Sequence, residues 1–481
     1  MGDATTSSLE PKTAEAHAPD TPPPPTQEEA LVDIEEIYYS SSASKSLEYD
    51  FSRIQKARIH RFPHHLMGIG GDDKRYVVPS VVAIGPYHRG LPHLQEMEEI
   101  KKAVTNKVCG SFCLSLVDVH KRILTLASDA RRCYDVSAVA DLSDGEFTAM
   151  MVVDACFLLW FMAGKIDDPL KVGCILSFGP RIANDMLLLD NQIPWLVLDI
   201  LITEFMGLRR EDVLAFIQGL ADAGFRSAPN PKTATIVFRN GRIDENCDFA
   251  ADILARTAAQ HYETPHHLLD HLWAVLRCNL MPPHNKGENE LMRPRKSRPI
   301  SAVELMHAGF KLTASTAGWF AYMKCQKKKL YFTGELSLSP LILGETMACR
   351  LVNLAALESV QATNSVDWDV DGYIVSSYLF MLAMLIIGEE DVHELRKSGI
   401  LISNFSDAQT LAFFKGIRQH LRAGYLFLNT VDEIHECLRK RKVSIAIRKF
   451  VYNNYKTFVT VLSIAGVLIG VFKALYSLKK P

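Results

Sequence analysis

The feature that most constrains this chain is a polar triplet, Asp190–Gln192, inside the otherwise apolar stretch Asp185–Leu198. Four apolar residues precede the triplet, and Ile193-Pro194 leads into a second apolar run. A helix-forming run that meets a polar break and then a proline predicts a helix, a tight corner and a second helix. We expect Pro194 in the first turn of the second helix, where its missing N–H costs nothing.

The triplet itself, Asp190, Asn191 and Gln192, is flanked by apolar residues on both sides. We expect the three side chains to cap the two helix ends by bonding backbone groups that a helix leaves unpaired. Three adjacent polar side chains could instead line a site, and that alternative stays open. The rest of the sequence contains no catalytic signature, so we expect no enzymatic activity.

Composition excludes several classes of protein. The 481 residues are 48% hydrophobic and 22% charged, as in a globular chain with a large core. The formal net charge of −2 gives no bulk attraction to nucleic acid, which we do not expect as a partner. Ten cysteines are present, but there is no CxxC pair, and Cys109 and Cys113 are one helical turn apart. We therefore expect reduced, mostly buried thiols in a cytosolic environment, without a metal or a cofactor.

Three parts of the chain differ in composition. Residues 1–45 are rich in Pro, Ser, Thr and acidic residues and are predicted to be a disordered tail. Residues 46–450 are predicted to form a large, mainly α-helical body with a few short β-strands, interrupted by a flexible basic loop at 282–299. Residues 457–478 are predicted to be a transmembrane anchor.

Two segments of the body are apolar enough to predict buried helices. Asp144–Ala163 is apolar nearly all round except for Asp154, a carboxylate that needs a cation or several donors, and we expect a core salt bridge there. Gly372–Gly388 carries no charge, which suggests a membrane segment. It is short for a bilayer and is flanked by acidic residues, so a buried core helix is predicted.

The segment Tyr76–Gly90 contains many β-branched residues between Pro and Gly and is predicted to be extended. Its glycines, Gly85 and Gly90, suggest a phosphate loop, but no Lys-Ser/Thr follows, so the Walker pattern fails. Histidines are dense in and before this segment, and without ligand spacing we expect them to be solvated or hydrogen-bonded rather than a metal or acid–base cluster; they are His60, His64, His65, His88 and His93.

Another histidine pair, His267 and His271, has the i, i+4 spacing of zinc proteases. Leu268 stands where that motif has its catalytic Glu, so we expect a helix surface rather than a metal site.

The later elements are predicted from local patterns. Ser301-Ala302-Val303-Glu304 is a capping box that opens a helix through His307, which Gly309 ends. The remaining predictions are a hairpin signal at Asn240-Gly241, two short strands about Gly334 in Lys329–Leu343, and helices over Thr346–Ser359, Asp391–Ser403 and Asp407–Leu426.

The C-terminal segment Thr457–Phe472 is free of charge and, with Lys473 reaching toward the interface, extends through Leu478. This length suits a bilayer span. Lys and Arg are more frequent before the segment than after it, which predicts a cytosolic body with only a few residues crossing. A final core helix is the alternative.

In order and content these segments resemble the land-plant family catalogued as domain of unknown function 247, over about Ile54–Tyr476. The most specific pair of motifs is GPYHRG at 85–90 and LLLDNQIP at 187–194. Asp190 departs from the Glu that is usual in the family, and the Pro-Trp pair often found before the terminal apolar segment is missing. The matching residues that we expect to be structural are Gly85, Pro86, Tyr87, His88, Asp154, Asp190, Asn191, Gln192, Pro194 and Asn353.

The resemblance implies a helical, plant-specific protein, often membrane-associated and without an assigned activity. Some grass members are similar to male determinants of gametophytic self-incompatibility, which implies pollen recognition or signalling. We therefore predict a non-enzymatic recognition or scaffold protein, anchored in a lipid bilayer by its C-terminal helix, with an unidentified protein partner. One alternative is a membrane-tethered hydrolase that uses Asp154, Asp190 and the histidines near His88. Another is a soluble protein whose last helix packs on its own core.

Overall fold

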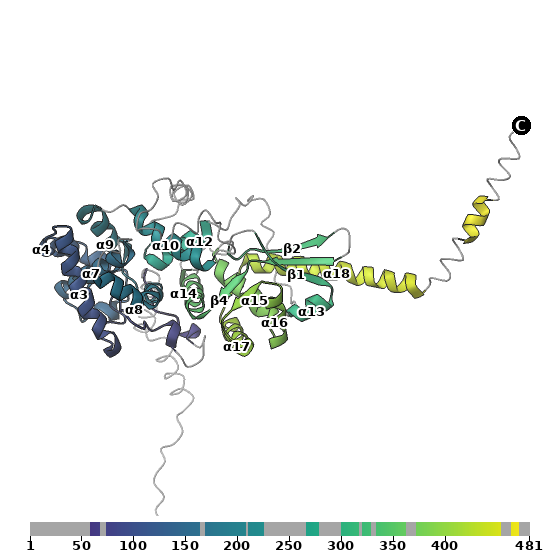
Figure 1. Cartoon of the computed structure of the whole chain (residues 1–481), viewed down its shortest axis with the longest axis horizontal. Coiled ribbons are helices and arrows are strands. Elements are labelled where there is room, and N and C mark those ends of the chain that lie inside the picture. Colours follow the sequence, from purple (N-terminus) through teal and green to yellow (C-terminus); the bar gives the residue numbers. More distant parts are fainter. Residues whose placement is uncertain are drawn as a thin grey trace, which may run out of the picture. The chain divides into compact units, whose positions relative to one another are not determined.

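A computed structural model describes residues 58–67, 74–163, 169–207, 210–225, 266–278, 300–316, 320–328, 333–361, 372–453 and 463–470. These residues are mainly helical, as predicted, with short strands in the second half of the chain (Figure 1). The predicted disordered tail, the basic loop 282–299 and the Asn240-Gly241 hairpin lie outside the described residues.

The described elements of the first half of the chain are all helices, and α7 lies at their centre. This helix contacts α3, α4, α5, α9 and α10, and most of its side chains are buried, as predicted for a helix that is apolar all round. The elements are η1 (His64–Leu66), η2 (Lys74–Tyr76), η3 (Pro92–Leu94), α3 (Gln95–Ser111), α4 (Leu116–Leu124), α5 (Ala127–Arg131), α6 (Val136–Val139), α7 (Asp144–Met162), α8 (Pro169–Asp185), α9 (Trp195–Ile200), the π-helix η4 (Leu201–Phe205), α10 (Arg210–Phe225) and α12 (Leu268–Cys278).

The second half combines helices with two small sheets. Strand β3 lies between β1, to which it is parallel, and β2, to which it is antiparallel, while β4 and β5 form a parallel pair. The elements are α13 (Ala302–His307), β1 (Phe310–Ala314), β2 (Met323–Lys328), β3 (Thr333–Leu338), β4 (Leu341–Leu343), α14 (Glu345–Gln361), α15 (Ile374–Leu385), α16 (Glu389–Lys397), β5 (Leu401–Ser403), α17 (Asp407–Arg418) and α18 (Tyr425–Asn453).

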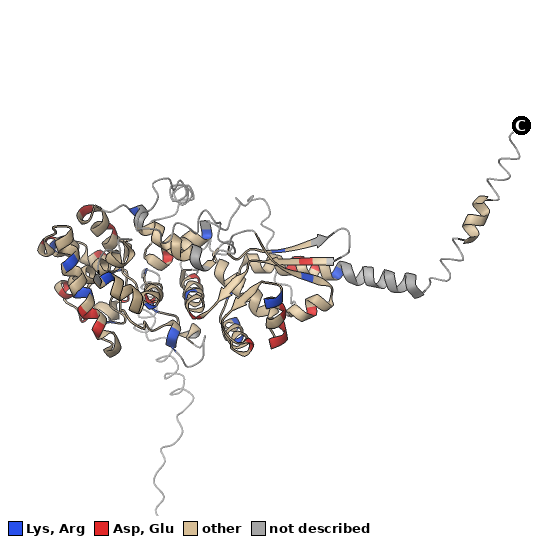
Figure 2. Ribbon diagram, viewed as in Figure 1, with Lys and Arg blue, Asp and Glu red and all other residues tan. Residues whose placement is uncertain are grey.

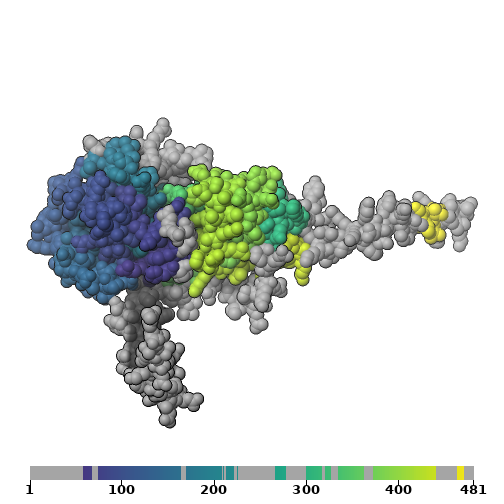
Figure 3. All heavy atoms as spheres, turned by 90° about the horizontal axis from the view of Figure 1, so that it is seen from below, coloured from purple at the N-terminus to yellow at the C-terminus, as the bar shows by residue number. Residues whose placement is uncertain are grey.

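One hydrophobic core runs through both halves. Helix α14 connects them, because it contacts η2, α8 and α12 from the first half and α15 and β4 from the second. The space-filling view shows the purple-to-blue and green residues in contact (Figure 3). Helix α15, which was predicted to be a core helix, is almost wholly buried beside α14, α17 and α18. Acidic and basic positions are interspersed along the described helices (Figure 2).

Several local predictions are confirmed, and others are wrong at the boundaries. Ser301 and Glu304 form the predicted capping box, and Gly309 adopts a positive φ of 78° after the helix. The strands predicted about Gly334 are instead separated at Ser339 and Pro340, and Gly334 lies inside β3. The predicted helix Asp391–Ser403 is α16 followed by strand β5.

The described residues do not support the predicted C-terminal transmembrane anchor. Among those residues, α7 is the helix long and apolar enough to cross a membrane, and most of it is buried inside the protein. Of residues 457–478, only 463–470 are described, and they are helical with Ile464, Val467, Leu468 and Ile469 exposed.

Candidate functional site

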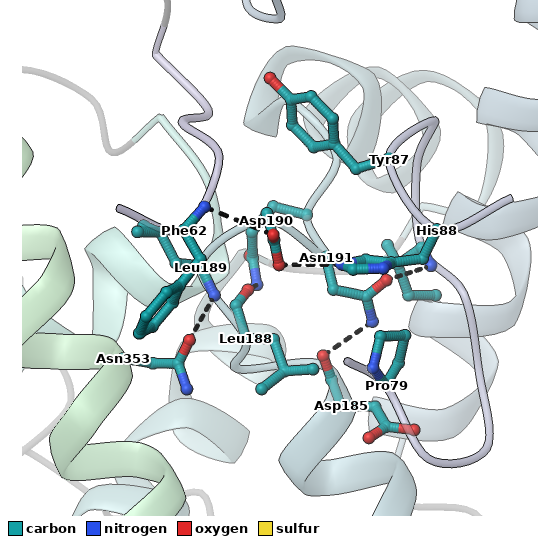
Figure 4. A network of polar contacts seen from close by, with 12 residues as sticks. Phe62, Pro79, Tyr87, His88, Asp185, Leu188, Leu189, Asp190, Asn191 and Asn353 are labelled. Carbon is teal, nitrogen blue, oxygen red and sulfur yellow. Dashed lines mark hydrogen bonds and ion pairs between the residues drawn. The ribbon is translucent and has the colours of Figure 1, made fainter. Parts of the chain in front are cut away.

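The corner between α8 and α9 is at the centre of a buried network of polar contacts (Figure 4). Helix α8 ends at Asp185 and α9 begins at Trp195, so the predicted helix, corner and helix are confirmed. Pro194 is the residue before α9, with a φ of −62° and an extended ψ of 136°. It therefore lies one position earlier than predicted and sets the direction in which α9 starts.

Asp185 holds the start of the irregular segment 80–85. Its carboxylate accepts hydrogen bonds from the backbone N–H groups of Ser80, Val81 and Val82 at 2.9, 2.7 and 3.0 Å. The Ser80 hydroxyl donates to the same carboxylate. Burial raises the pKa of Asp185 above its ordinary value, while these backbone donors act in the opposite direction.

Asn191 continues the same contact with both atoms of its amide. Its Oδ1 accepts from the Ile84 N–H at 2.7 Å, and its Nδ2 donates to the carbonyls of Val82 and Asp185 at 3.0 and 2.8 Å. Gln192 bonds the corner itself, because its Nε2 donates to the carbonyls of Met186 and Leu188 at 2.8 and 2.7 Å.

The predicted capping role of this triplet is therefore confirmed for only one of the two helix ends. Asn191 bonds the last carbonyl of α8, but the Gln192 Oε1 accepts from Leu269 N–H, in the first turn of α12, at 3.4 Å. The first N–H of α9, that of Trp195, donates to the carbonyl of His266 at 2.8 Å. The triplet thus connects α8 to α12, a partner that lies far along the chain.

Asp154 on α7 holds the end of the segment 80–85. Its Oδ2 accepts from Gly85 N–H at 2.8 Å, and its Oδ1 lies 2.6 Å from Lys101 Nζ on α3, which confirms the predicted core salt bridge. The same ammonium contacts Glu98 and donates to the Ala83 carbonyl. Burial alone would lower the pKa of Lys101, but the two carboxylates outweigh it and raise the pKa; burial raises the pKa of Asp154.

The prediction that Tyr76–Gly90 is extended is wrong at both ends, because Tyr76 closes η2 and residues 87–90 form a turn, and the segment 80–85 between them is irregular rather than a strand. The backbone of this segment is bonded by side chains from α3, α7, α8 and the corner, which stand where a neighbouring strand would be. Gly85 is required at the last position, because its φ is +76° and an added Cβ would lie 2.5 Å from the carbonyl oxygen of Gln192.

Asp190 and the GPYHRG motif meet at the side of the corner. Asp190 Oδ1 lies 2.9 Å from His88 Nε2, and its Oδ2 accepts from Phe62 N–H at 3.4 Å. Tyr87 donates its hydroxyl to the Ile59 carbonyl at 2.9 Å. Pro86, which lies between Gly85 and Tyr87 in the motif, is half-buried.

Asn353 ties the corner to α14. Its Oδ1 accepts from Leu189 N–H at 2.8 Å, and its Nδ2 donates to the carbonyls of Tyr76 and Cys349 at 2.9 Å. The structure thus brings the motif residues Asp154, Asp190, Asn191, Gln192 and Asn353 into hydrogen bonds with segments that lie far along the chain.

Comparison with known proteins shows the family to which the chain belongs. A family described as a plant protein of unknown function, DUF247, matches residues 59–469. The chain belongs to the DUF247 family. It is also 25% identical to a UPF0481 protein of Arabidopsis thaliana, over 79% of this chain and 76% of that protein. A putative UPF0481 protein of the same plant is 29% identical over 25% of this chain and 22% of its own length. No solved structure matches.

Two histidines of this DUF247 chain are placed differently from the prediction, whereas His88 and His93 are hydrogen-bonded as predicted. His267 and His271 are not a helix surface: both are buried, and His271 packs against the ring of Trp195. Burial lowers the pKa of each to about 4. His60 is also buried, with a pKa that burial lowers, whereas His93 contacts the Pro79 carbonyl. Within the described part of the chain, no group of three His, Cys, Asp or Glu side chains could hold a metal ion.

Sequence reasoning assigned no role to Asp185 and Lys101 in this network, or to Glu358. Glu358 on α14 is fully buried and accepts from Val375 N–H, Ser376 N–H and the Ser376 hydroxyl at 2.8, 2.8 and 2.6 Å, and from Trp273 Nε1 at 3.1 Å. It caps the first turn of α15, and burial raises its pKa to about 7. The available signal was a Glu inside an apolar helical pattern, which implies donors nearby.

Proposed function

We propose that this plant protein is a membrane-anchored recognition or scaffold protein rather than an enzyme. The observation that carries the proposal is the use of the motif side chains within the fold. Asp185, Asn191, Gln192 and Asn353 each bond two or more backbone groups, and Asp154 bonds Gly85 and Lys101. A catalytic side chain must be able to reach a substrate, and these buried side chains are occupied by the protein itself.

The anchoring part of the proposal is supported by the terminal apolar segment. Residues 463–470 are helical, and between 55% and 68% of Ile464, Val467, Leu468 and Ile469 is exposed. Exposed apolar surface costs about 25 cal/mol per Å² in water, so transfer of such a helix into lipid is favourable. The Lys and Arg residues before the segment favour a cytosolic body.

A protein partner is supported by a second set of exposed apolar side chains in and beside α4. Phe112, Leu116, Val117 and Leu124 are each at least 40% exposed. Exposed apolar residues that gather on one element are typical of interaction surfaces. Pollen recognition, which is implied for some grass relatives, stays a prediction.

Fractionation of membranes from plant cells tests the anchor. The full chain is expected in the pellet after carbonate extraction with its body open to added protease, and a chain that ends at Lys456 is expected in the supernatant. A double substitution, Ile464→Asp with Leu468→Asp, should release the full-length chain. The matched control is Leu176→Asp, at an exposed apolar residue of α8, which should remain in the pellet.

Extraction of the unsubstituted full chain by carbonate would contradict the anchor and favour the alternative in which the last helix packs on the body. Retention of both the full chain and the shortened chain would place the membrane contact elsewhere in the molecule.

One contact favours the alternative hydrolase. His88 and Asp190 form a pair 2.9 Å apart, and each is close to one-tenth exposed at the side chain. The third member of that hypothesis, Asp154, is bonded to Lys101 and Gly85. We therefore expect no turnover of ester and phosphoester substrates by the purified chain. Turnover that Asp190→Asn abolishes while the unfolding midpoint is kept would establish the enzyme instead.

A further inference from the structure

Two cysteines from different elements face each other where α18 packs on β2. The Sγ atoms of Cys325 on β2 and Cys437 on α18 are 3.7 Å apart, and both residues are buried. They are separated by 112 positions in the sequence, so only the fold brings them together. A disulfide has an S–S distance of about 2.05 Å, so its formation requires the two sulfur atoms to approach by less than about 2 Å.

A second contact fixes the register of α18 against β2. Glu433 precedes Cys437 by one helical turn and therefore lies on the same face of α18. Its carboxylate accepts a hydrogen bond from the backbone N–H of Cys325 at 3.0 Å. Helix α18 also contacts β3, the central strand of the same sheet. The approach of the two thiols is thus set by a packed interface with two independent contacts.

We propose that Cys325 and Cys437 are a reversible redox site, which a hydroperoxide oxidises to a disulfide. One thiolate attacks the peroxide oxygen and becomes a sulfenic acid, and the cleaved O–O bond releases water or an alcohol. The second thiol then attacks the sulfenic sulfur and releases water as the disulfide forms. The two sulfur atoms lose two electrons in total, and the peroxide gains them.

Structural zinc does not fit this pair. A structural zinc ion takes four ligands, and the described residues provide no group of three candidate ligands. A disulfide in a reducing compartment is transient or regulatory rather than structural, which agrees with reduced thiols in the resting protein. Its effect here would be to join the three-stranded sheet covalently to α18, the last long helix before residues 457–478.

Peptide mapping of the full chain tests the proposal. The reduced protein is treated with hydrogen peroxide, free thiols are blocked with N-ethylmaleimide, and the protein is digested with trypsin. We expect peptide 325–327 linked to peptide 423–439, two hydrogen atoms lighter than their sum, and loss of the link after dithiothreitol. Cys437→Ser and Cys325→Ser should each abolish the link, whereas Cys113→Ser, at an exposed cysteine, should leave it unchanged.

A stability measurement gives a second readout on the same samples. The midpoint of urea unfolding should shift to a higher urea concentration after oxidation of the unsubstituted chain and of Cys113→Ser, because the link closes a long loop. It should not shift for Cys437→Ser. Full alkylation of Cys325 and Cys437 after peroxide, sulfinic acid at either residue without the linked peptide, or a link to another cysteine would each overturn the proposal.

Discussion

The irregular segment 80–85 and strand β3 both place backbone in the interior, but they satisfy its hydrogen bonds in different ways. Strand β3 is paired along its length with β1 on one side and β2 on the other, so backbone bonds backbone. In residues 80–85, the N–H groups of Val81, Ile84 and Gly85 donate to side chains of Asp185, Asn191 and Asp154.

This contrast explains why the specific motifs of the family lie where they do. A strand ladder tolerates many side chains, because the bonds are made by atoms that every residue has. A segment held by side chains requires a carboxylate or an amide at fixed positions, and a lost one leaves buried N–H groups without partners. The motifs at 85–90 and 187–194 are therefore more specific than the sequence of a strand that held the same segment would need to be.

The largest expected effect is that of Asp185→Ala. The two buried N–H groups of Val81 and Val82 and the partly buried N–H of Ser80 would lose their acceptor. At about 1–3 kcal/mol for each unpaired group, we expect the free energy of unfolding in urea to fall by about 4 kcal/mol. The control is Ser337→Ala on β3, which keeps every ladder bond and should cost less than about 1 kcal/mol. Equal losses for the two variants would contradict the comparison.

The next effect concerns Gly85, whose backbone approaches the corner. In Gly85→Ala, the added Cβ would meet the Gln192 carbonyl oxygen at 2.5 Å in a residue with positive φ. Gly90 has a similar φ of +82° but nothing within 4 Å of its Cβ position, so Gly90→Ala pays only the backbone strain of about 1–2 kcal/mol. We expect Gly85→Ala to cost about 2 kcal/mol more than Gly90→Ala in thermal or urea unfolding. Indistinguishable midpoints would show that the corner can move away.

A third prediction uses Glu358, another side chain that takes the place of a backbone partner. Burial raises its pKa to about 7, so the folded protein retains a proton that the unfolded chain releases near pH 4.5. The stability from this group is present below about pH 4.5 and is lost as the pH rises to 7, by up to about 3 kcal/mol. In Glu358→Gln, the unfolding free energy should no longer decrease in this way between pH 5 and 7. An unchanged slope would mean that the carboxylate is already ionised in the fold.

The smallest effect is expected at His271, whose side chain does not replace a backbone hydrogen-bond partner. Neither ring nitrogen of His271 is hydrogen-bonded among the described residues, and burial lowers its pKa to about 4. The contribution of the neutral His271 ring to the free energy of unfolding is present above pH 6.5 and is lost as the pH falls toward 4. His271→Phe should therefore raise the unfolding free energy at pH 5 by about 1–2 kcal/mol more than at pH 7.5.

The control for this prediction is His393→Phe, at an exposed histidine of α16, which should leave the pH dependence unchanged. A loss of stability at pH 5 in His271→Phe would show that the imidazole is bonded in the folded protein and that the site resembles the side-chain network at 80–85.

Local signals in the sequence were sufficient for much of this fold. Periodicity and a polar break predicted the corner after α8, the all-round apolar pattern predicted the buried α7, and Ser301 with Glu304 predicted a helix start. Each depends on residues within one or two helical turns, where spacing decides geometry. The same local view misplaced His267 and His271, because i, i+4 spacing defines a face but not whether another helix covers it.

The sequence alone predicted the mainly helical class, the corner after α8 and the need of Asp154 for a cation or several donors. The packing of distant elements selects the group that pairs with each buried polar residue. Asp185 lies more than a hundred positions from Ser80, Asn353 lies 164 from Leu189, and Cys325 lies 112 from Cys437. A buried polar group must be paired, and this requirement can be predicted from a single residue and its neighbours in the sequence. The identity of its partner depends on how distant elements pack, which no local pattern contains.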